Sequence, residues 1–358
     1  MALEKVNYSD IKKPVWDEFC IHSNSAWFQH TTEWIRYTQE MYGESNCQNE
    51  SFAVVEDSKI LAISVAMKEL REEKNKSNLT MAGFPTVYPA FEKNLSLKKL
   101  KTVEKYTMER VFEIKDIGQY QFFVSPLIQN FLDGSIRVNP LLKFGFTNTS
   151  ISTNIIDISQ GRGKLFKNMF KGCRTDIKHA LKNEDLSTFI IDKENYNEYT
   201  FQEFKNIHFE AAGRKTRSDI TWDIQREWII NGLAILGICK YKDSFVSGIF
   251  INKYKNNYYY QVGATRPEHM RIRGIGQLLQ WSFIEYLINA GGRYYELGWN
   301  WYPNFSQEIA DEKMLAISSF KRSFGGDIYP LFRGEKFRSS SFMEEEYKKR
   351  LITYQSYY

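Results

Sequence analysis

A basic, glycine-rich turn, Arg271 to Gly276, has the residue types best suited in this chain to bind a phosphate. It follows a β-rich run, 258–262, and precedes apolar residues at helical spacing. Backbone N–H groups at the start of a helix bind phosphate oxygens, glycine permits close approach, and arginine adds charge-assisted hydrogen bonds. The residues that we predict to hold a phosphate-bearing cofactor are Arg271, Arg273, Gly274, Ile275 and Gly276. The alternative is a plain strand–helix connection with solvated arginines.

A second group could move a proton. His208 and Glu210 stand near the end of a predicted helix, 196–212, and either could act as a general base on an acceptor amine. Residues two apart diverge on a regular helix, so we expect only one of them to face a site. Arg214 and Arg217 follow directly and could clamp a carboxylate or phosphate of the acceptor. Solvated charges around a capping glycine are the alternative.

Glu296 ends a predicted strand that begins at Tyr294. A carboxylate at a strand end is a candidate base or amine-binding group, although an ion pair with Arg293 would explain it equally well. We therefore predict Glu296 as a catalytic residue and keep the ion pair as the alternative.

Cations recur at three- and four-residue steps between residues 164 and 182. On a single helix they would fall within an arc of roughly 80°. The residues are Lys164, Lys167, Lys171, Arg174, Lys178 and Lys182. Like charges on one face repel, so this predicted basic helix favours an anionic partner: a nucleotide-linked acceptor, tRNA or the surface of an anionic membrane. A solvated face is the alternative.

The composition narrows the class of protein. The chain has 358 residues and a net charge of +5, which suits two globular domains and an anionic ligand without indicating nucleic acid. The four cysteines are scattered and do not cluster with the five histidines, so we predict no metal site and no disulfide framework. The polar start of the chain and the lack of any long apolar run predict a cytoplasmic protein, with peripheral membrane contact as an option.

The elements that position these groups follow from periodicity. The second half reads as strand, two helices, three strands, helix and strand, and the first half has a similar but degenerate layout. It includes a hairpin around Asp57-Ser58, a charged loop at 68–78 and a helix at 97–114. By themselves these patterns predict an α+β protein with mixed sheets.

The turn R-x-x-G-x-G resembles the acyl-CoA loop of the GNAT acyltransferases. With Glu296-Leu297-Gly298 and Phe320-Lys321-Arg322-Ser323-Phe324-Gly325-Gly326 downstream, the chain resembles the FemAB-like branch of that superfamily, which includes the peptidoglycan-bridge aminoacyltransferases. The resemblance implies two tandem GNAT-like lobes. It places a degenerate lobe at 1–152 and a catalytic lobe at 153–327, with 328–358 returning to the first.

The resemblance also assigns residues. It implies that Lys321 lies at the active cleft, where a cation would stabilise an oxyanion. It adds Trp222 and Gln225 to the acceptor wall, Tyr88 to an acceptor-side loop, and Arg174 to a motif that begins the second half. The resulting substrate-binding set is Arg174, Arg214, Arg217, Trp222, Gln225 and Tyr88.

Together these features predict an N-acyltransferase that moves an acyl group from acyl-CoA to an amine of a cell-envelope precursor: an amino sugar, a nucleotide-sugar or a peptide, free or lipid-linked. Two alternatives stay open. One is a FemAB-type enzyme that takes its aminoacyl group from aminoacyl-tRNA and acts on a peptidoglycan precursor. The other is a binding protein that keeps the fold without the chemistry.

Overall fold

The computed structural model describes residues 2–42, 46–71, 76–303 and 310–356. The chain forms two compact units. The first contains residues up to Ile151 together with those from Pro330 onward, and the second contains Ser152–Tyr302 and Asp311–Tyr329. Both units combine mixed sheets with helices, so the predicted α+β class is confirmed.

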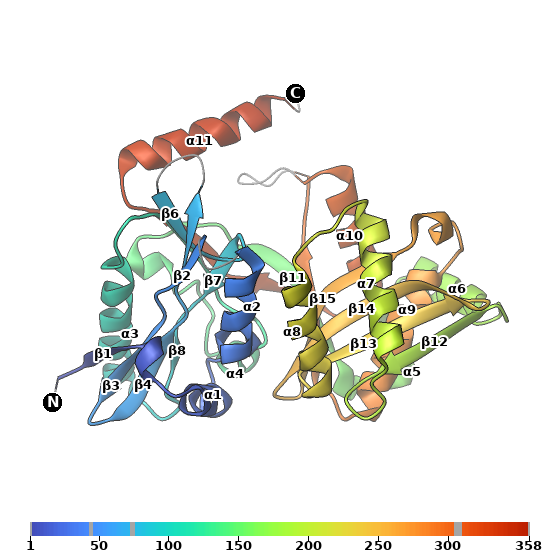
Figure 1. Ribbon diagram of the computed structural model, residues 1–358, viewed down its shortest axis with the longest axis horizontal. Coiled ribbons are helices and arrows are strands. Elements are labelled where there is room, and N and C mark those ends of the chain that lie inside the picture. Colours follow the sequence, from blue (N-terminus) through green and yellow to red (C-terminus); the bar gives the residue numbers. More distant parts are fainter. Residues whose placement is uncertain (1, 43–45, 72–75, 304–309, 357–358) are drawn as a thin grey trace. The chain divides into compact units, whose positions relative to one another are not determined.

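The first unit is built on two sheets, of orders β1-β3-β4-β8 and β10-β18-β9-β7-β6-β5-β2 (Figure 1). The strands of the first sheet are β1 Glu4–Asn7, β3 Phe52–Glu56, β4 Lys59–Ser64 and β8 Ala90–Phe91. Those of the second are β10 Thr147–Asn148, β18 Arg333–Phe337, β9 Ile117–Phe123, β7 Phe84–Val87, β6 Lys76–Met81, β5 Met67–Arg71 and β2 Cys47–Asn49. Its helices are α1 Lys13–His22, α2 Thr32–Tyr42, α3 Leu97–Phe112, α4 Gln129–Leu132 and α11 Ser340–Gln355.

Local sequence explains several of these elements. The β3–β4 hairpin turns at Asp57 and Ser58, whose φ angles of 50° and 65° are the left-handed values that a two-residue turn requires. Ser96 caps α3 by accepting a hydrogen bond from the Lys99 N–H. The expected charged loop at 68–78 is wrong, because β5 and β6 pair antiparallel there. Leu79 and the other inward residues of these strands are buried, which favours strands over a loop. Residues 72–75 lie outside the described ranges.

The end of the chain belongs to the first unit. β18 pairs antiparallel with β9, and α11 packs against β18. The Phe342 ring of α11 is buried against Gly118, where a Cβ atom would lie 2.9 Å from the ring. A buried aromatic ring at a glycine is therefore what fixes α11 to this sheet.

The second unit has one sheet, of order β12-β13-β14-β15-β16-β11-β17. Its strands are β11 Ile151–Asp157, β12 Leu186–Ile191, β13 Ala234–Tyr241, β14 Ser244–Tyr254, β15 Asn257–Thr265, β16 Tyr294–Asn300 and β17 Asp327–Leu331. Its helices are α5 Arg162–Asn168, α6 Lys171–Ala180, α7 Glu198–Ala212, α8 Asp219–Ile230, α9 Ile275–Asn289 and α10 Glu312–Ser323. The predicted order from strand β12 to strand β16 is confirmed.

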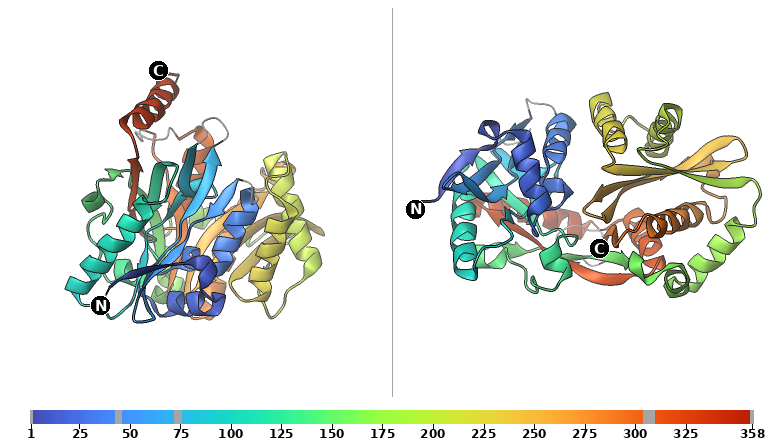
Figure 2. Two further views of the ribbon diagram at one scale, coloured as in Figure 1. Left: turned by 60° about the vertical axis from the view of Figure 1, so that its left-hand side comes forward. Right: turned by 90° about the horizontal axis from the view of Figure 1, so that it is seen from below.

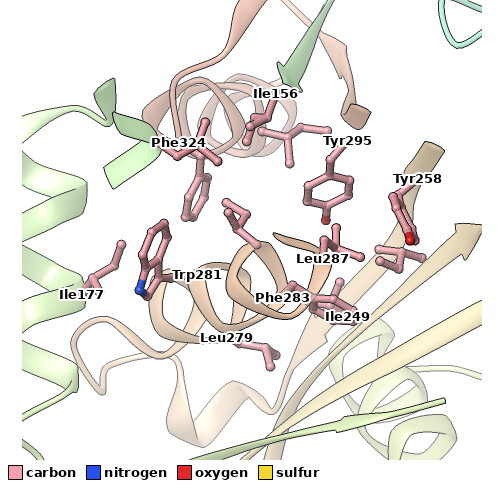
Figure 3. Close-up of a cluster of buried hydrophobic side chains, with 14 of the residues drawn as sticks. Ile156, Ile177, Ile249, Tyr258, Leu279, Trp281, Phe283, Leu287, Tyr295 and Phe324 are labelled. Atoms are coloured by element: carbon pink, nitrogen blue, oxygen red, sulfur yellow. The ribbon is translucent and has the colours of Figure 1, made fainter. Parts of the chain in front are cut away.

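The helices of this unit cover both faces of its sheet. α7 and α8 pack on one face, and α9 lies on the other with α6 beside it (Figure 2). Leu279, Phe283 and Leu287 of α9 form the centre of the core with Tyr258 and Tyr295 of the sheet (Figure 3). These apolar positions recur at four-residue steps, which is why the helix forms and which face it buries. A Cβ atom on Gly237 would lie 2.2 Å from the Phe283 ring, so glycine allows α9 to approach β13 closely.

The predicted single basic helix at 164–182 is wrong. α5 ends at Asn168 and α6 begins at Lys171, with Met169 and Phe170 in extended conformation between them. Met169 is buried in the core, and the Phe170 N–H donates to the Ser323 carbonyl at 2.9 Å, so the chain is drawn out of the helical path. The Arg174 guanidinium donates to the Lys167 and Met169 carbonyls, and so supplies hydrogen bonds to carbonyl groups at the C-terminal end of α5.

Candidate active site

The parallel ladder between β15 and β16 is short. It joins Asn257–Tyr259 to Tyr294–Glu296, and both strands then continue, to Thr265 and Asn300, paired with their outer neighbours β14 and β11. Beyond the last pair, Tyr259 opposite Glu296, the two facing strand edges no longer hydrogen-bond to each other. Ligands of α/β folds commonly bind where the carboxyl ends of neighbouring parallel strands diverge. The polar groups at this point are therefore the first candidates for a site.

Glu296 is the buried carboxyl group at the end of that ladder. It is only 2% exposed, and its Oε1 accepts a hydrogen bond from the Thr153 hydroxyl at 2.9 Å. Burial raises the pKa of Glu296 to about 7, against the opposing effects of the Thr153 hydrogen bond and the Lys321 charge. The carboxyl group is thus poised to gain and lose a proton near neutral pH.

Lys321 reaches the same place from α10. Its Nζ donates to the Trp299 carbonyl at 3.4 Å and lies 5.6 Å from the centre of the Tyr260 ring. Burial lowers the pKa of Lys321 to about 8, while the nearby Glu296 carboxylate acts in the opposite direction. Burial and Glu296 also raise the pKa of Tyr259. The two groups named by sequence, Glu296 and Lys321, are therefore coupled through their charges.

Two hydrogen bonds and one aromatic contact order α10 and place it beside β16. Asp311 caps the helix by accepting from the Met314 N–H at 2.7 Å. The buried Ser318 hydroxyl accepts from the Trp301 N–H at 2.9 Å, one helical turn before Lys321. Phe320 and Phe324 contact each other edge to face at 5.0 Å and pack on the core. These contacts hold the Lys321 side chain at the end of β16.

A further polar network supports the other side of β16. The Asn300 side chain donates to Asn154 Oδ1 at 2.6 Å, and the Asn154 amide donates to the Gly325 carbonyl at 3.2 Å. Both asparagines are buried. Sequence analysis did not select Thr153 or Asn154 as functional residues. The signal was available, since three consecutive polar residues, Ser152 to Asn154, interrupt the apolar strand β11, but a single sequence does not show which buried partner they meet.

The glycine-rich turn packs tightly against neighbouring helices. Gly274 has a φ of 84°, and a Cβ atom there would lie 2.5 Å from the Asp176 carbonyl oxygen of α6. A Cβ atom on Gly276 would lie 3.3 Å from the Phe320 ring. Arg273 forms an ion pair with Asp176 at 2.8 Å, whereas Arg271 is exposed. Among the described residues, no side chain caps α9, so the N–H groups that follow Gly274, including those of Ile275 and Gly276, begin the helix without a side-chain acceptor.

The residues of the predicted acceptor wall form a separate group at the α7–α8 corner. His208 lies edge-on to Trp222 at 5.2 Å, and burial, followed by the Arg217 charge, lowers the pKa of His208 to about 4. Arg217 stacks over the Trp222 ring at 4.1 Å, while Arg214 is exposed. Glu210 forms an ion pair with Arg266 at 3.2 Å.

Three further members of the predicted substrate-binding set, Gln225, Arg174 and Tyr88, lie away from the α7–α8 corner or are covered within their own unit. Gln225 is fully buried on α8, and Arg174 ends α5 by its hydrogen bonds to backbone carbonyls. Tyr88 lies in the first unit, where its hydroxyl donates to Glu104 at 2.6 Å. Within the described part of the chain, no cluster of histidine, cysteine or acidic residues could hold a metal ion, and no helix has the length and apolarity to cross a membrane.

Part of this chain is similar to a known family of domains, and its fold is similar to several solved structures. Residues 226–306, which include β13 to β16, match the model of an acetyltransferase (GNAT) domain. No curated protein matches the chain by sequence. Among solved structures, FemX superposes with a TM-score of 0.65 at 14% identity, over 96% of this chain and 99% of FemX.

Two further structures have the same fold. The C-terminal domain of a putative lysylphosphatidylglycerol synthetase from Agrobacterium fabrum gives a TM-score of 0.57 at 11% identity, covering 94% of this chain and 96% of that one. A tandem GNAT protein from the clavulanic acid biosynthesis pathway gives 0.51 at 9% identity, covering 94% and 99%. The tandem GNAT fold predicted from sequence is thereby confirmed.

Proposed function

Starting from a chain that carries a GNAT acetyltransferase domain and has the FemAB-like tandem fold, we propose that it is an N-acyltransferase that uses acyl-CoA. The observation that carries the proposal is the pair of buried Glu296 and half-buried Lys321 where the β15–β16 ladder ends. Strongly shifted pKa values of two coupled groups are typical of sites that transfer protons. A purely structural role would not require an acid and a base poised so near neutrality.

The reaction follows from these two groups. The nitrogen of a neutral acceptor amine attacks the thioester carbonyl, a C–N bond forms, and the C–S bond to coenzyme A breaks. Glu296, with a pKa of about 7, accepts the proton that the amine loses. Lys321, a cation below about pH 8, stabilises the oxyanion and can then donate a proton to the departing thiolate. The proton balance closes when Glu296 returns its proton to Lys321.

The rival bases are less suited to this role. His208 is neutral at pH 7, but a conjugate acid of pKa about 4 makes it a weak base there. Glu210 is held by Arg266. We therefore assign proton acceptance to Glu296, and we propose that His208, Arg214, Arg217 and Trp222 shape the acceptor side. Gln225, being fully buried, would support that wall from beneath.

The start of α9 is the proposed cofactor site. The uncapped N–H groups of its first turn and the exposed Arg271 are suited to the pyrophosphate of coenzyme A. Arg273 would contribute only if it left Asp176. The resemblance to the FemAB-like branch supports a cell-envelope acceptor that carries an amine. A cytoplasmic location agrees with acyl-CoA as the donor.

A thiol-release assay tests the proposal. Wild-type protein is supplied with acetyl-CoA and a panel of amino sugars, nucleotide-sugars and peptides with free amines, and thiol release is followed. The affinity of the protein for coenzyme A is measured in parallel by calorimetry. Lys321→Met should lower kcat by about a hundredfold or more, through loss of oxyanion stabilisation, and leave coenzyme A binding unchanged. Absence of coenzyme A binding by the wild type would contradict the choice of donor. Binding without turnover of any amine would favour the non-catalytic alternative.

Aminoacyl-tRNA is the second candidate donor, favoured by the surface of α5 and α6. Lys164, Lys167, Lys171 and Lys178 are exposed there, and among the described residues none of them forms an ion pair. Their distribution over two helices weakens the argument for one continuous face.

Reversal of these four lysines to Glu separates the candidates. If charged tRNA binds, its affinity should fall steeply with the reversal and with added salt through counterion release. Anionic vesicles test the membrane alternative in the same way. Reversal of Lys93 and Lys98, exposed lysines of the first unit, is the matched control.

A further inference from the structure

A cavity of about 570 Å³ lies entirely within the first unit. Tyr88 and Pro89, which follow β7, and Val124 and Ser125, which follow β9, line it on the side of the sheet. α3 closes another side through Leu100 and Glu104. Cavities that bind small molecules in proteins have volumes in the range of roughly 300–1,000 Å³.

The position of this cavity repeats that of the proposed active site in the other unit. In each unit a strand is followed by a helix and then by a parallel strand: β7, α3 and β9 in the first, with the short strand β8 between β7 and α3, and β15, α9 and β16 in the second. The β7–β9 ladder ends at Val87 opposite Phe123, and the cavity begins with the next residue of each strand. Carboxyl ends of parallel strands that diverge leave a crevice suited to a ligand.

The lining is mostly apolar. It includes three exposed apolar side chains, Leu97, Val138 and Leu142, of which the first two are 77% and 71% exposed. Apolar side chains gathered around a cavity mouth lose contact with water when an apolar ligand covers them. The body of the ligand is therefore expected to be apolar.

The charged groups of the lining are three cations, Lys101, Arg137 and Lys143, and one carboxylate, Glu104. Glu104 is buried, and its carboxylate already accepts from the Tyr88 hydroxyl and from Lys143 Nζ, so its charge is compensated within the wall. Arg137 donates from Nε to the Gly134 carbonyl, and this hydrogen bond leaves the two terminal nitrogens of its guanidinium for a ligand. Lys101 lines the cavity one turn from Leu97 and, among the described residues, forms no ion pair. Lys101 and Arg137 thus leave an excess of positive charge.

We propose that this cavity binds an amphipathic anion: an apolar chain that ends in a carboxylate or a phosphate. The chain would contact Leu97, Leu100 and Val138, and the anionic head would bind Lys101 and Arg137. The proposal rests on residues of the first unit alone and does not depend on the transferase chemistry proposed for Glu296 and Lys321.

Calorimetry with the full chain and simple probes tests the proposal. Dodecyl phosphate and laurate should each bind with one-to-one stoichiometry, dodecanol should bind at least about tenfold more weakly, and inorganic phosphate should not bind measurably. Laurate alone would identify a fatty-acid-type ligand, and dodecyl phosphate alone a phosphorylated lipid-type ligand. Dodecanol binding as tightly as the anions, or inorganic phosphate binding as tightly as dodecyl phosphate, would overturn the proposal.

Variants connect the binding to the cavity. Combined Lys101→Ala and Arg137→Ala substitutions should weaken binding of the anions about tenfold or more and leave dodecanol binding unchanged. Lys105→Ala, one turn further along the same helix and outside the cavity lining, is the matched control and should have no effect. Leu100→Trp should block all chain ligands. Val138→Asp, at the exposed mouth where folding is not at risk, should repel the anions only. Retention of full anion binding by the double Ala variant and by Val138→Asp would refute the site.

Discussion

A Cβ atom at position 298 would lie 3.1 Å from Lys321 Nζ, so any side chain there would require the ammonium group to shift by a few tenths of an ångström. The φ angle of Gly298, 84°, is also in the left-handed region that other residues rarely adopt. The glycine of the Glu296-Leu297-Gly298 segment therefore serves both the backbone and the position of the lysine.

Gly298→Ala should lower kcat, because the new methyl group forces Lys321 Nζ to shift by a few tenths of an ångström. It should also cost about 1–2 kcal/mol of stability from the backbone conformation. Gly291→Ala is a matched control, since Gly291 has a φ of 70° with no atom near its missing Cβ. Steady-state kinetics and thermal unfolding of both variants separate the two effects. Equal activity of the two variants would show that Lys321 does not depend on the space at Gly298.

The pH dependence of turnover should report the Glu296–Lys321 pair. kcat/KM should rise as Glu296 loses its proton near pH 7 and fall as Lys321 loses its proton near pH 8, which gives a narrow maximum between these values. In Glu296→Gln the rise near pH 7 should disappear and the rate should drop. A wild-type profile that is flat from pH 6 to 9 would remove the pair from the chemistry.

The free energy of unfolding should decrease with rising pH through the ionisation of Glu296. Because the pKa of Glu296 is raised in the folded state from 4.5 to about 7, the folded chain holds a proton that the unfolded chain has released between those values. Its contribution to the free energy of unfolding is therefore present below about pH 4.5 and declines as the pH rises to about 7, at up to roughly 1.4 kcal/mol per pH unit. Denaturant titrations at pH 5, 6 and 7 should show this decline in the wild type and a flatter dependence in Glu296→Gln.

Thr153 should act as a positioning residue for Glu296. Its hydroxyl donates to the carboxylate and opposes the effect of burial, so Thr153→Val should raise the pKa of Glu296 further. The acidic limb of the pH–rate profile should then move to higher pH, whereas Thr153→Ser should restore it. Coenzyme A affinity serves as the control and should not change. A lower rate with an unmoved profile would indicate a structural role for the hydroxyl alone.

The Arg273–Asp176 ion pair allows the cofactor turn to be tested. If Arg273 binds pyrophosphate, Arg273→Ala should weaken coenzyme A binding by roughly tenfold. Asp176→Asn, which frees the arginine, should not weaken that binding. If the pair only joins α6 to the turn, both variants should lower thermal stability by a similar small amount and leave coenzyme A affinity unchanged. Calorimetry of the two variants decides between these outcomes.

Local patterns in the sequence were enough to predict the order of elements from β12 to β16 and the glycine-rich start of α9, because periodicity and turn residues act over a few neighbours. The same patterns placed a single helix over residues 164–182. The buried Met169 side chain and the Phe170–Ser323 backbone hydrogen bond, which join distant segments, break that helix in two. Tertiary packing thus overrode a helical pattern at the point where the core required an extended chain.

By itself the sequence offered Glu296 at the end of a predicted strand, and the resemblance to the FemAB-like branch added Lys321. Only the tertiary structure decided that Lys321 lies close enough to the buried Glu296 to affect its pKa, that Thr153 donates to Glu296, and that Arg273 is held by Asp176. The physical reason is that pKa shifts and hydrogen-bond partners depend on burial and on segments far apart in the chain. Composition and spacing cannot encode either of these without the packed core that brings the segments together.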